Sequence, residues 1–71
     1  MIVINLDKLL AQQRILSKEL AERIDLSENN LSRIKTGQIR AIRFSTLNAL
    51  CRELGCKPGD ILDYVEDGAG E

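Results

Sequence analysis

Apolar residues recur along this chain at the three- and four-residue spacing of amphipathic helices, in five separate segments. The first segment follows Asn5, a suitable capping residue, and fades near Gln13. The fourth starts at Ser45 and stops at Gly55, and Pro58, which suits a first helical position, opens a short fifth. The pattern predicts an all-α fold of five short helices in one domain.

The second and third segments are joined too closely for a loop. Ser17 is expected to cap the second helix and Ser27 to cap the third, which ends near Thr36. Asp25 tolerates the left-handed backbone that such a sharp reversal needs. Ala21 is small enough for two helices to cross closely. We therefore expect a helix-turn-helix whose buried seam is formed by Leu20, Ile24, Leu26, Leu31 and Ile34.

The third helix presents a polar face. If Leu31 and Ile34 face the core, the 100° step per residue turns Asn29, Ser32, Arg33 and Thr36 outward, with Glu28 and Asn30 on the flanks. An asparagine amide pairs with adenine, an arginine with guanine or a phosphate, and a glutamate with the cytosine amino group. A solvated helix surface whose short polar residues act as caps is the alternative interpretation. The predicted base-contacting residues are Glu28, Asn29, Asn30, Ser32 and Arg33.

Charge is unevenly distributed, although the net charge is only −1. Residues 29–52 contain no Asp or Glu, and their basic residues are Arg33, Lys35, Arg40, Arg43 and Arg52. Residues 53–71 have one lysine against six acidic residues. A phosphate backbone would attract the first region and repel the second. The distribution indicates a nucleic-acid surface centred on the third helix, with the acidic end turned away from it.

Several classes of function are disfavoured. The chain has no histidine, so it lacks the commonest general base and zinc ligand. Cys51 and Cys56 are five positions apart without further ligands, so we interpret them as small buried apolar residues in a reducing compartment. The apolar run from Met1 to Ile4 is too short for a signal peptide. We expect a cytoplasmic protein without enzymatic activity, cofactor or metal.

Two segments, LSKELAERIDLSENNLSRIKTG and AIRFSTLNALCRELGCKPGDIL, agree in order and spacing with a known pattern. The chain resembles the Cro/CI-type helix-turn-helix family of phage repressors and their bacterial relatives, from about Leu6 to Leu62. Leu16 stands where a capping Ser or Thr is common, Ser17 where a phosphate-binding Gln is common, and Asp25 where Gly is common. The first two departures predict a second helix that begins one residue late.

The resemblance implies a lambda-repressor-like domain whose third helix enters the major groove of double-stranded DNA. It also places the connection after that helix along the phosphate backbone, where arginines and the backbone N–H groups that open the fourth helix bind phosphate oxygens. The phosphate-contacting residues expected on these grounds are Ser17, Lys18, Lys35, Arg40, Arg43, Ser45 and Thr46.

We expect one domain over residues 1–66 and a flexible acidic tail over 67–71. Regulators of this design pair to read two half-sites, so we expect a homodimer. The apolar residues near the two ends, Ile2, Val3, Ile4, Ile61, Leu62, Tyr64 and Val65, could supply the pairing surface or pair with each other as a small ribbon. The leading hypothesis is a sequence-specific transcriptional regulator, most simply a repressor. Two alternatives remain open: an antitoxin with a toxin as its protein partner, and a protein-interaction module without DNA binding.

Overall fold

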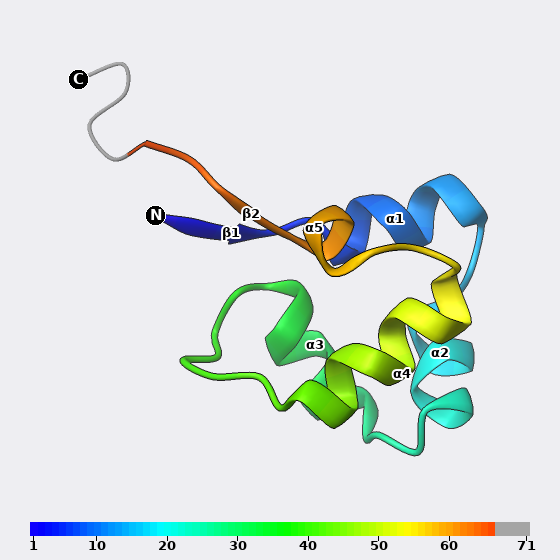
Figure 1. Ribbon diagram of the computed structural model, residues 1–71. Coiled ribbons are helices and arrows are strands. Elements are labelled where there is room, and N and C mark those ends of the chain that lie inside the picture. The colour runs from blue at the N-terminus through cyan, green and yellow to red at the C-terminus, as the bar shows by residue number, and fades with distance from the viewer. Residues whose placement is uncertain (67–71) are drawn as a thin grey trace.

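The computed structural model describes residues 1–66, so the predicted flexible tail lies outside the described residues. Five helices and one two-stranded antiparallel sheet make up this part of the chain (Figure 1). The elements are β1 (Ile2–Ile4), α1 (Leu6–Gln13), α2 (Ser17–Arg23), α3 (Glu28–Lys35), α4 (Phe44–Leu54), α5 (Pro58–Ile61) and β2 (Leu62–Tyr64). The prediction of five short helices is confirmed, and the small ribbon that the sequence left open is present as a two-stranded sheet.

The helix starts test the predicted caps. Ser27 caps α3 as expected, because its Oγ accepts a hydrogen bond from the backbone N–H of Asn30 at 3.1 Å. Asn5 precedes α1 as expected, but its side chain makes no capping hydrogen bond. Pro58 opens α5, also as expected.

Two predicted caps are wrong. Helix α2 begins at Ser17 itself, with Leu16 at the capping position, so this helix does not begin late. Its first backbone bond already runs from the Leu20 N–H to the Leu16 carbonyl, and the Ser17 hydroxyl has another partner. Helix α4 begins at Phe44 after Arg43, because the Leu47 N–H donates to the Arg43 carbonyl at 3.0 Å. Ser45 therefore lies inside the first turn of α4.

Residues with a left-handed backbone conformation end helices or reverse the direction of the chain at several points. Asp25 has φ 56°, as predicted for the turn between α2 and α3. Gly55, with φ 61°, ends α4 where the sequence placed its terminator. Arg14 also has φ 56°, at the end of α1, and the sequence pattern gave no sign of it. A left-handed backbone is uncommon for such a residue, so the α1–α2 connection constrains Arg14.

Every helix contributes to one core. Leu6, Leu20, Leu31, Leu50 and Ile61 are the largest fully buried side chains, and they come from α1, α2, α3, α4 and α5 respectively. None of the residues buried in the described part of the chain is polar or charged. The position of each helix is therefore set by packing of aliphatic side chains. No helix within residues 1–66 is long and apolar enough to cross a membrane.

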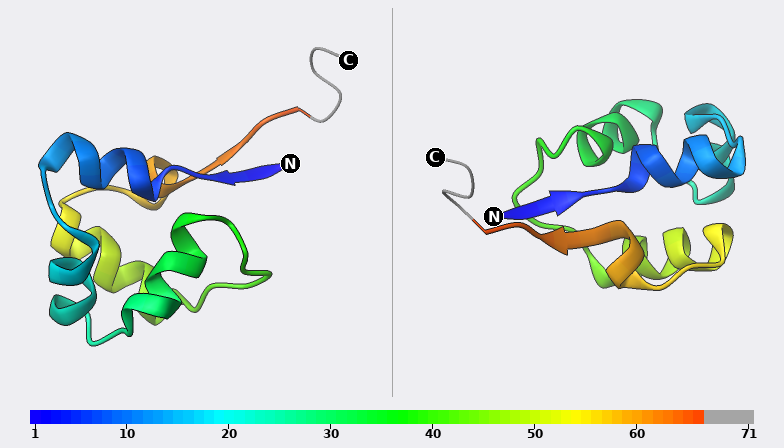
Figure 2. Two further views of the ribbon diagram at one scale, coloured as in Figure 1. Left: turned by 180° about the vertical axis from the view of Figure 1, so that it is seen from behind. Right: turned by 90° about the horizontal axis from the view of Figure 1, so that it is seen from above.

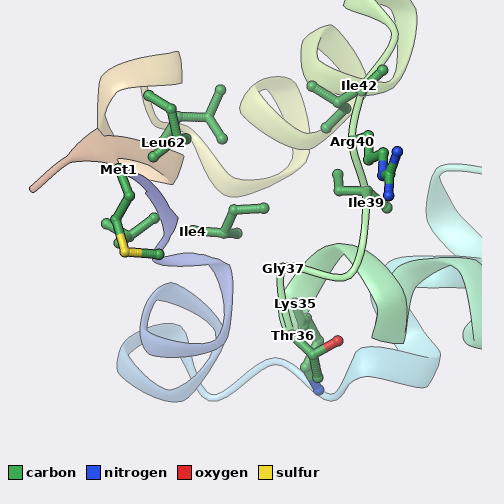
Figure 3. Close-up of a pocket in the computed structure, with 12 residues that line it drawn as sticks. Met1, Ile4, Lys35, Thr36, Gly37, Ile39, Arg40, Ile42 and Leu62 are labelled. Carbon is green, nitrogen blue, oxygen red and sulfur yellow. The ribbon is translucent and has the colours of Figure 1, made fainter. Parts of the chain in front are cut away.

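The two ends of the described chain pair with each other. Ile2, Val3 and Ile4 of β1 lie opposite Tyr64, Asp63 and Leu62 of β2. This is the ribbon that the sequence left as one alternative, although Ile61 belongs to α5 and is fully buried. Its inner residues, Ile4 and Leu62, pack against the core, while its outer end extends beyond the helices (Figures 2 and 3).

Candidate nucleic-acid interface

The crossing of α2 and α3 fixes the orientation of α3. Ala21 is only 2% exposed, which lets the two helices pack closely at the predicted position. The Leu26 N–H donates to the Ala21 carbonyl at 2.9 Å, so the turn is closed by a backbone hydrogen bond. Leu20 and Leu31 are fully buried on either side of this turn. The seam thus forms as the sequence predicted, although Ile24 and Leu26 are half-buried.

The outward face of α3 is polar and accessible. Leu31 and Ile34 are buried, and all five predicted base-contacting residues, Glu28, Asn29, Asn30, Ser32 and Arg33, are exposed. The Thr36 hydroxyl, on the same face, donates back to the Ser32 carbonyl at 3.0 Å. The face is therefore accessible to a ligand along most of its length, while the Thr36 hydroxyl is already engaged in a hydrogen bond within its own helix. Contact of these residues with bases remains a prediction.

A hollow of about 500 Å³ lies between α3 and the start of α4, and three arginines line it. Arg33 comes from α3, Arg40 from the α3–α4 connection, and Arg43 from the position before α4. Asn30 and Thr46 complete its polar lining. No carboxylate in residues 1–66 forms an ion pair with any of the three arginines. Their positive charge is uncompensated, and it is gathered beside the exposed face of α3.

The first turn of α4 begins at the hollow, which Arg43 and Thr46 line, and it carries backbone donors. The first hydrogen bond of this helix starts at the Leu47 N–H, so the N–H groups of Ser45 and Thr46 have no acceptor within the helix. Such free N–H groups and the helix dipole favour an anion. Ser45 is exposed and Thr46 is half-buried at the rim. Contact of these two residues with a phosphate remains a prediction.

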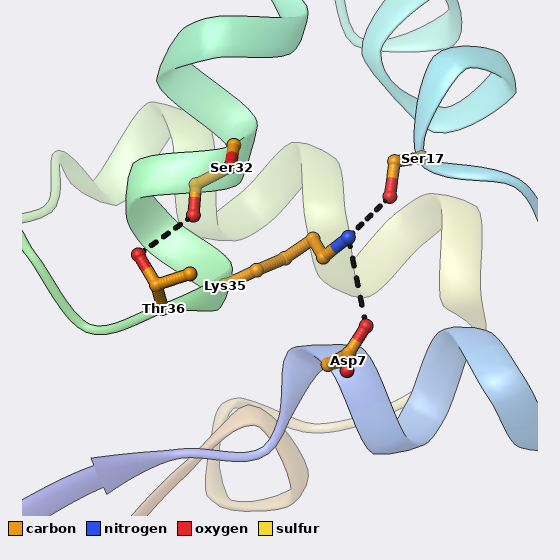
Figure 4. Close-up of polar contacts among 5 residues, drawn as sticks. All are labelled: Asp7, Ser17, Ser32, Lys35 and Thr36. Carbon is orange, nitrogen blue, oxygen red and sulfur yellow. Dashed lines mark hydrogen bonds and ion pairs between the residues drawn. The ribbon is translucent and has the colours of Figure 1, made fainter.

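Lys35 lies in a different environment from the arginines. Its Nζ donates a hydrogen bond to the Ser17 Oγ at 2.6 Å and lies 3.5 Å from a carboxylate oxygen of Asp7 (Figure 4). Only 22% of the Lys35 side chain is exposed. This cluster, which we call the Lys35 bridge, ties α3 to the start of α2 and to α1. Two predicted phosphate contacts, Ser17 and Lys35, thus hold each other, whereas Lys18 is exposed on α2.

Asp7 was missed as a partner of Lys35. In the sequence, Asp7 is only an acidic residue in the first turn of a helix, a favourable position for an anion at any helix start. It stands twenty-eight positions before Lys35, so no local spacing links the two residues. Their proximity is a consequence of the packing of α1 against α3.

Acidic residues near the described C-terminal end are kept away from the α2–α3 turn. Asp60 belongs to α5 and Asp63 to β2, and both elements lie on the opposite side of the helices from that turn (Figure 1). This agrees with the predicted separation of charge for Asp60 and Asp63. Asp67 and Glu71 lie outside the described residues.

The two cysteines are free and half-buried. Burial, followed by the neighbouring Cys51, raises the pKa of the Cys56 thiol, so Cys56 is a protonated thiol at neutral pH. No group of three or more His, Cys, Asp or Glu side chains in residues 1–66 is arranged to hold a metal ion.

A buried two-helix crossing, an exposed polar helix and an adjoining cluster of cations define a helix-turn-helix DNA-binding domain. Residues 5–67 match the Cro/C1-type HTH DNA-binding domain, and the chain belongs to this family. The chain is also 48% identical over 66 residues to a Bacillus subtilis (strain 168) protein named "Uncharacterized HTH-type transcriptional regulator YozG". That match covers 93% of this chain and 79% of the relative.

Proposed function

We propose that this protein is a sequence-specific DNA-binding transcriptional regulator, most simply a repressor, and that α3 reads the major groove. The observation that carries the proposal is the hollow in which Arg33, Arg40 and Arg43 gather without carboxylate partners among the described residues, beside the exposed face of α3. A duplex seated there would supply phosphates to the arginines and base edges to the helix. The relative described as an HTH-type transcriptional regulator supports the same role.

The residues divide into two roles. Asn29 and Arg33 project from the first two turns of α3 and read bases, since asparagine and arginine make the bidentate contacts that distinguish adenine and guanine. Arg40 and Arg43 bind the phosphate backbone of the DNA, and the free N–H groups at the start of α4 bind it as well. Glu28 sits at the first position of α3 and selects cytosine, since a carboxylate that finds no amino group there is repelled by phosphates.

The proposed repression results from occupancy of the operator by the protein. One domain of this size covers a single half-site, so two copies bind two half-sites whose centres are about 34 Å apart. The resulting complex blocks access to a promoter. Because its proposed ligand is genomic DNA, the protein is expected to act in the cytoplasm.

Selection of bound fragments from a random double-stranded DNA library tests the proposal. We expect enrichment of a sequence with two-fold symmetry, and binding that weakens steeply as salt rises, because each neutralised phosphate releases a counterion. Binding without enrichment of any sequence would contradict specific regulation. No binding at low salt would contradict the DNA-binding role itself and favour a protein-interaction module.

A further inference from the structure

The exposed apolar side chains of this protein are concentrated at the outer end of the ribbon. Among residues 1–66, the large apolar side chains with high exposure are Met1, Ile2, Leu16, Phe44, Tyr64 and Val65. Four of these six belong to β1, β2 or the residues adjoining them. Ile2 is 64% exposed and Tyr64, its partner across the ribbon, is 65% exposed. An apolar patch that extends from the body of a small domain marks a contact surface.

Within residues 1–66, no strand pairs with the outer edge of β1, and this free edge can accept another strand. Met1 and Val65 exchange backbone hydrogen bonds, and the Asn5 N–H donates to the Ile61 carbonyl at 2.7 Å. In an antiparallel ladder the bonded pairs alternate, so Val3 bonds to Asp63 while the N–H and C=O groups of Ile2 and Ile4 point away from β2. Ile2 and Ile4 therefore present a short row of strand donors and acceptors.

Charge distinguishes the two edges of the ribbon. The β2 segment carries Asp63 and is followed by Glu66, and charged side chains on an edge strand oppose pairing with another chain. The β1 segment, Ile2–Ile4, has no charged side chain. A second β1 strand meets no like-charge repulsion there, whereas a second β2 strand would bring carboxylates together. The β1 edge is thus the one at which two copies of the ribbon can meet without carboxylate repulsion.

A groove of about 450 Å³ accompanies β1 and gives an added strand a place to lie. One wall is the ribbon itself, represented by Ile4 and Leu62, and the other is the α3–α4 connection, with Ile39 and Ile42 (Figure 3). Gly37, at the end of α3, leaves part of the wall without a side chain. Lys35, Thr36 and Arg40 also line the groove, so it joins the β1 edge to a wall of apolar and cationic side chains that a second copy would face.

We propose that β1 of a second copy adds to the free edge of β1, forming a four-stranded antiparallel sheet in the order β2–β1–β1–β2. In the register that pairs all three residues, Ile2 lies opposite Ile4 of the second copy, and Val3 lies opposite Val3 on the two-fold axis. That axis is perpendicular to the sheet, as for any two adjacent antiparallel strands related by symmetry. Both α3 helices therefore lie on the same face of the four-stranded sheet. This inference specifies the interface of the homodimer under "Proposed function" and rests on that function for its biological role.

Cross-linking tests the register. In a Cys51→Ser/Cys56→Ser background, Val3→Cys brings two thiols together at a non-hydrogen-bonded pair, where Cα atoms are about 4.5 Å apart. We expect oxidised glutathione to convert this variant to a covalent dimer. Ile2→Cys in the same background is the matched control, because Ile2 faces Ile4 instead of its own copy. Equal cross-linking of both variants, or none of Val3→Cys, would overturn the proposed register.

Disruption of the edge tests the interface without any covalent bond. Ile2→Lys places a charge on the free edge, and we expect the dimer dissociation constant to rise by at least about tenfold. Leu16→Lys is the control, because Leu16 is equally exposed, at 66%, but lies at the start of α2. Sedimentation and circular dichroism measure association and folding. A wild type that is monomeric at its highest soluble concentration would overturn the proposal and leave the groove to an extended segment of another protein.

These results separate from the DNA-binding role. A duplex carrying one half-site requires only one copy of α3, so Ile2→Lys is expected to bind it like the wild type. Loss of dimerisation with intact half-site binding therefore supports the interface. Intact dimerisation without any DNA binding contradicts the proposed function and leaves the interface standing.

Discussion

Two basic regions border α3, and they differ in what their charges contact. In the hollow, Arg33, Arg40 and Arg43 face an open volume with no carboxylate partner in residues 1–66. In the Lys35 bridge, the ammonium group is hydrogen-bonded to Ser17 and paired with Asp7. The sequence counts Lys35 together with the arginines. The structure separates a surface open to a ligand from a contact that joins three helices.

The difference teaches that a cation near a reading helix is not by itself a phosphate contact. Lys35 follows directly after buried Ile34, so its stem leaves α3 toward the body of the protein. Arg33 stands two positions before Lys35, on the other side of Ile34, and leaves toward the hollow. Because each helical step turns the side-chain direction by about 100°, two positions turn it by about 200°, so these two cations face nearly opposite sides of α3. The predictions below test whether binding and stability divide in the same way.

Arg33→Ala should have the largest effect, and on binding. We expect a loss of about 1 to 3 kcal/mol toward the selected operator, concentrated at one base pair of each half-site, as for a bidentate arginine. Stability should change little, because Arg33 is exposed. Fluorescence anisotropy with operator and single-base variants measures the loss. Arg52→Ala is the control: it removes the same charge from the last turn of α4, outside the hollow. Equal losses for both would show that only net charge matters.

Lys35→Met should act mainly on stability. The substitution keeps most of the apolar stem and removes the hydrogen bond to Ser17 and the pair with Asp7. We expect the free energy of unfolding, measured by urea denaturation, to fall by about 1.5 kcal/mol, the lower end of the contribution of a hydrogen bond to a charged group. Lys18→Met, on the exposed face of α2, is the matched control and should leave stability unchanged. A larger effect on DNA affinity than on stability would mean that Lys35 turns to a phosphate on binding.

Arg40→Ala and Arg43→Ala should each have a smaller and less selective effect than Arg33→Ala. Both residues line the hollow from the segment between α3 and α4, not from α3 itself. Their loss should therefore weaken binding to operator and random DNA by similar factors. The slope of log affinity against log salt should fall by about 1 for each variant. Salt titrations on both kinds of duplex provide the measurement. A slope unchanged from wild type would remove that arginine from the set of phosphate contacts.

The sequence predicted the parts of the fold that depend on local periodicity. The positions of Leu31 and Ile34 along the helix fix which side of α3 is buried. This was sufficient to predict the outward face, and all five predicted base-contacting residues are exposed. The left-handed conformation of Asp25 was likewise predictable, because few residue types adopt that conformation in a turn. These features need only neighbours within one or two helical turns.

What the sequence did not predict depends on distant partners. Ser17 and Ser27 look alike as capping residues, but only Ser27 caps a helix, since the Ser17 hydroxyl accepts from Lys35 eighteen positions later. The gathering of Arg40 and Arg43 beside Arg33 depends on how the α3–α4 connection packs. The pairing of β1 with β2 joins the two ends of the described chain and was only one of two alternatives. Tertiary packing decides each of these cases.

Asp7→Asn should have the smallest effect, and it resolves the Lys35 bridge into its two contacts. The Asp7 side chain is 77% exposed, so solvent screens its 3.5 Å pair with Lys35, and such pairs contribute about 0.2 to 1 kcal/mol. Asp7 also lies in the first turn of α1, where an anion is favoured independently of Lys35. A double-mutant cycle with Lys35→Met separates these contributions, because only the pair appears in the coupling energy. A coupling energy of zero would show that the Ser17 hydroxyl alone holds Lys35, whereas coupling that falls with added salt identifies the ion pair as part of the contact between α1 and α3.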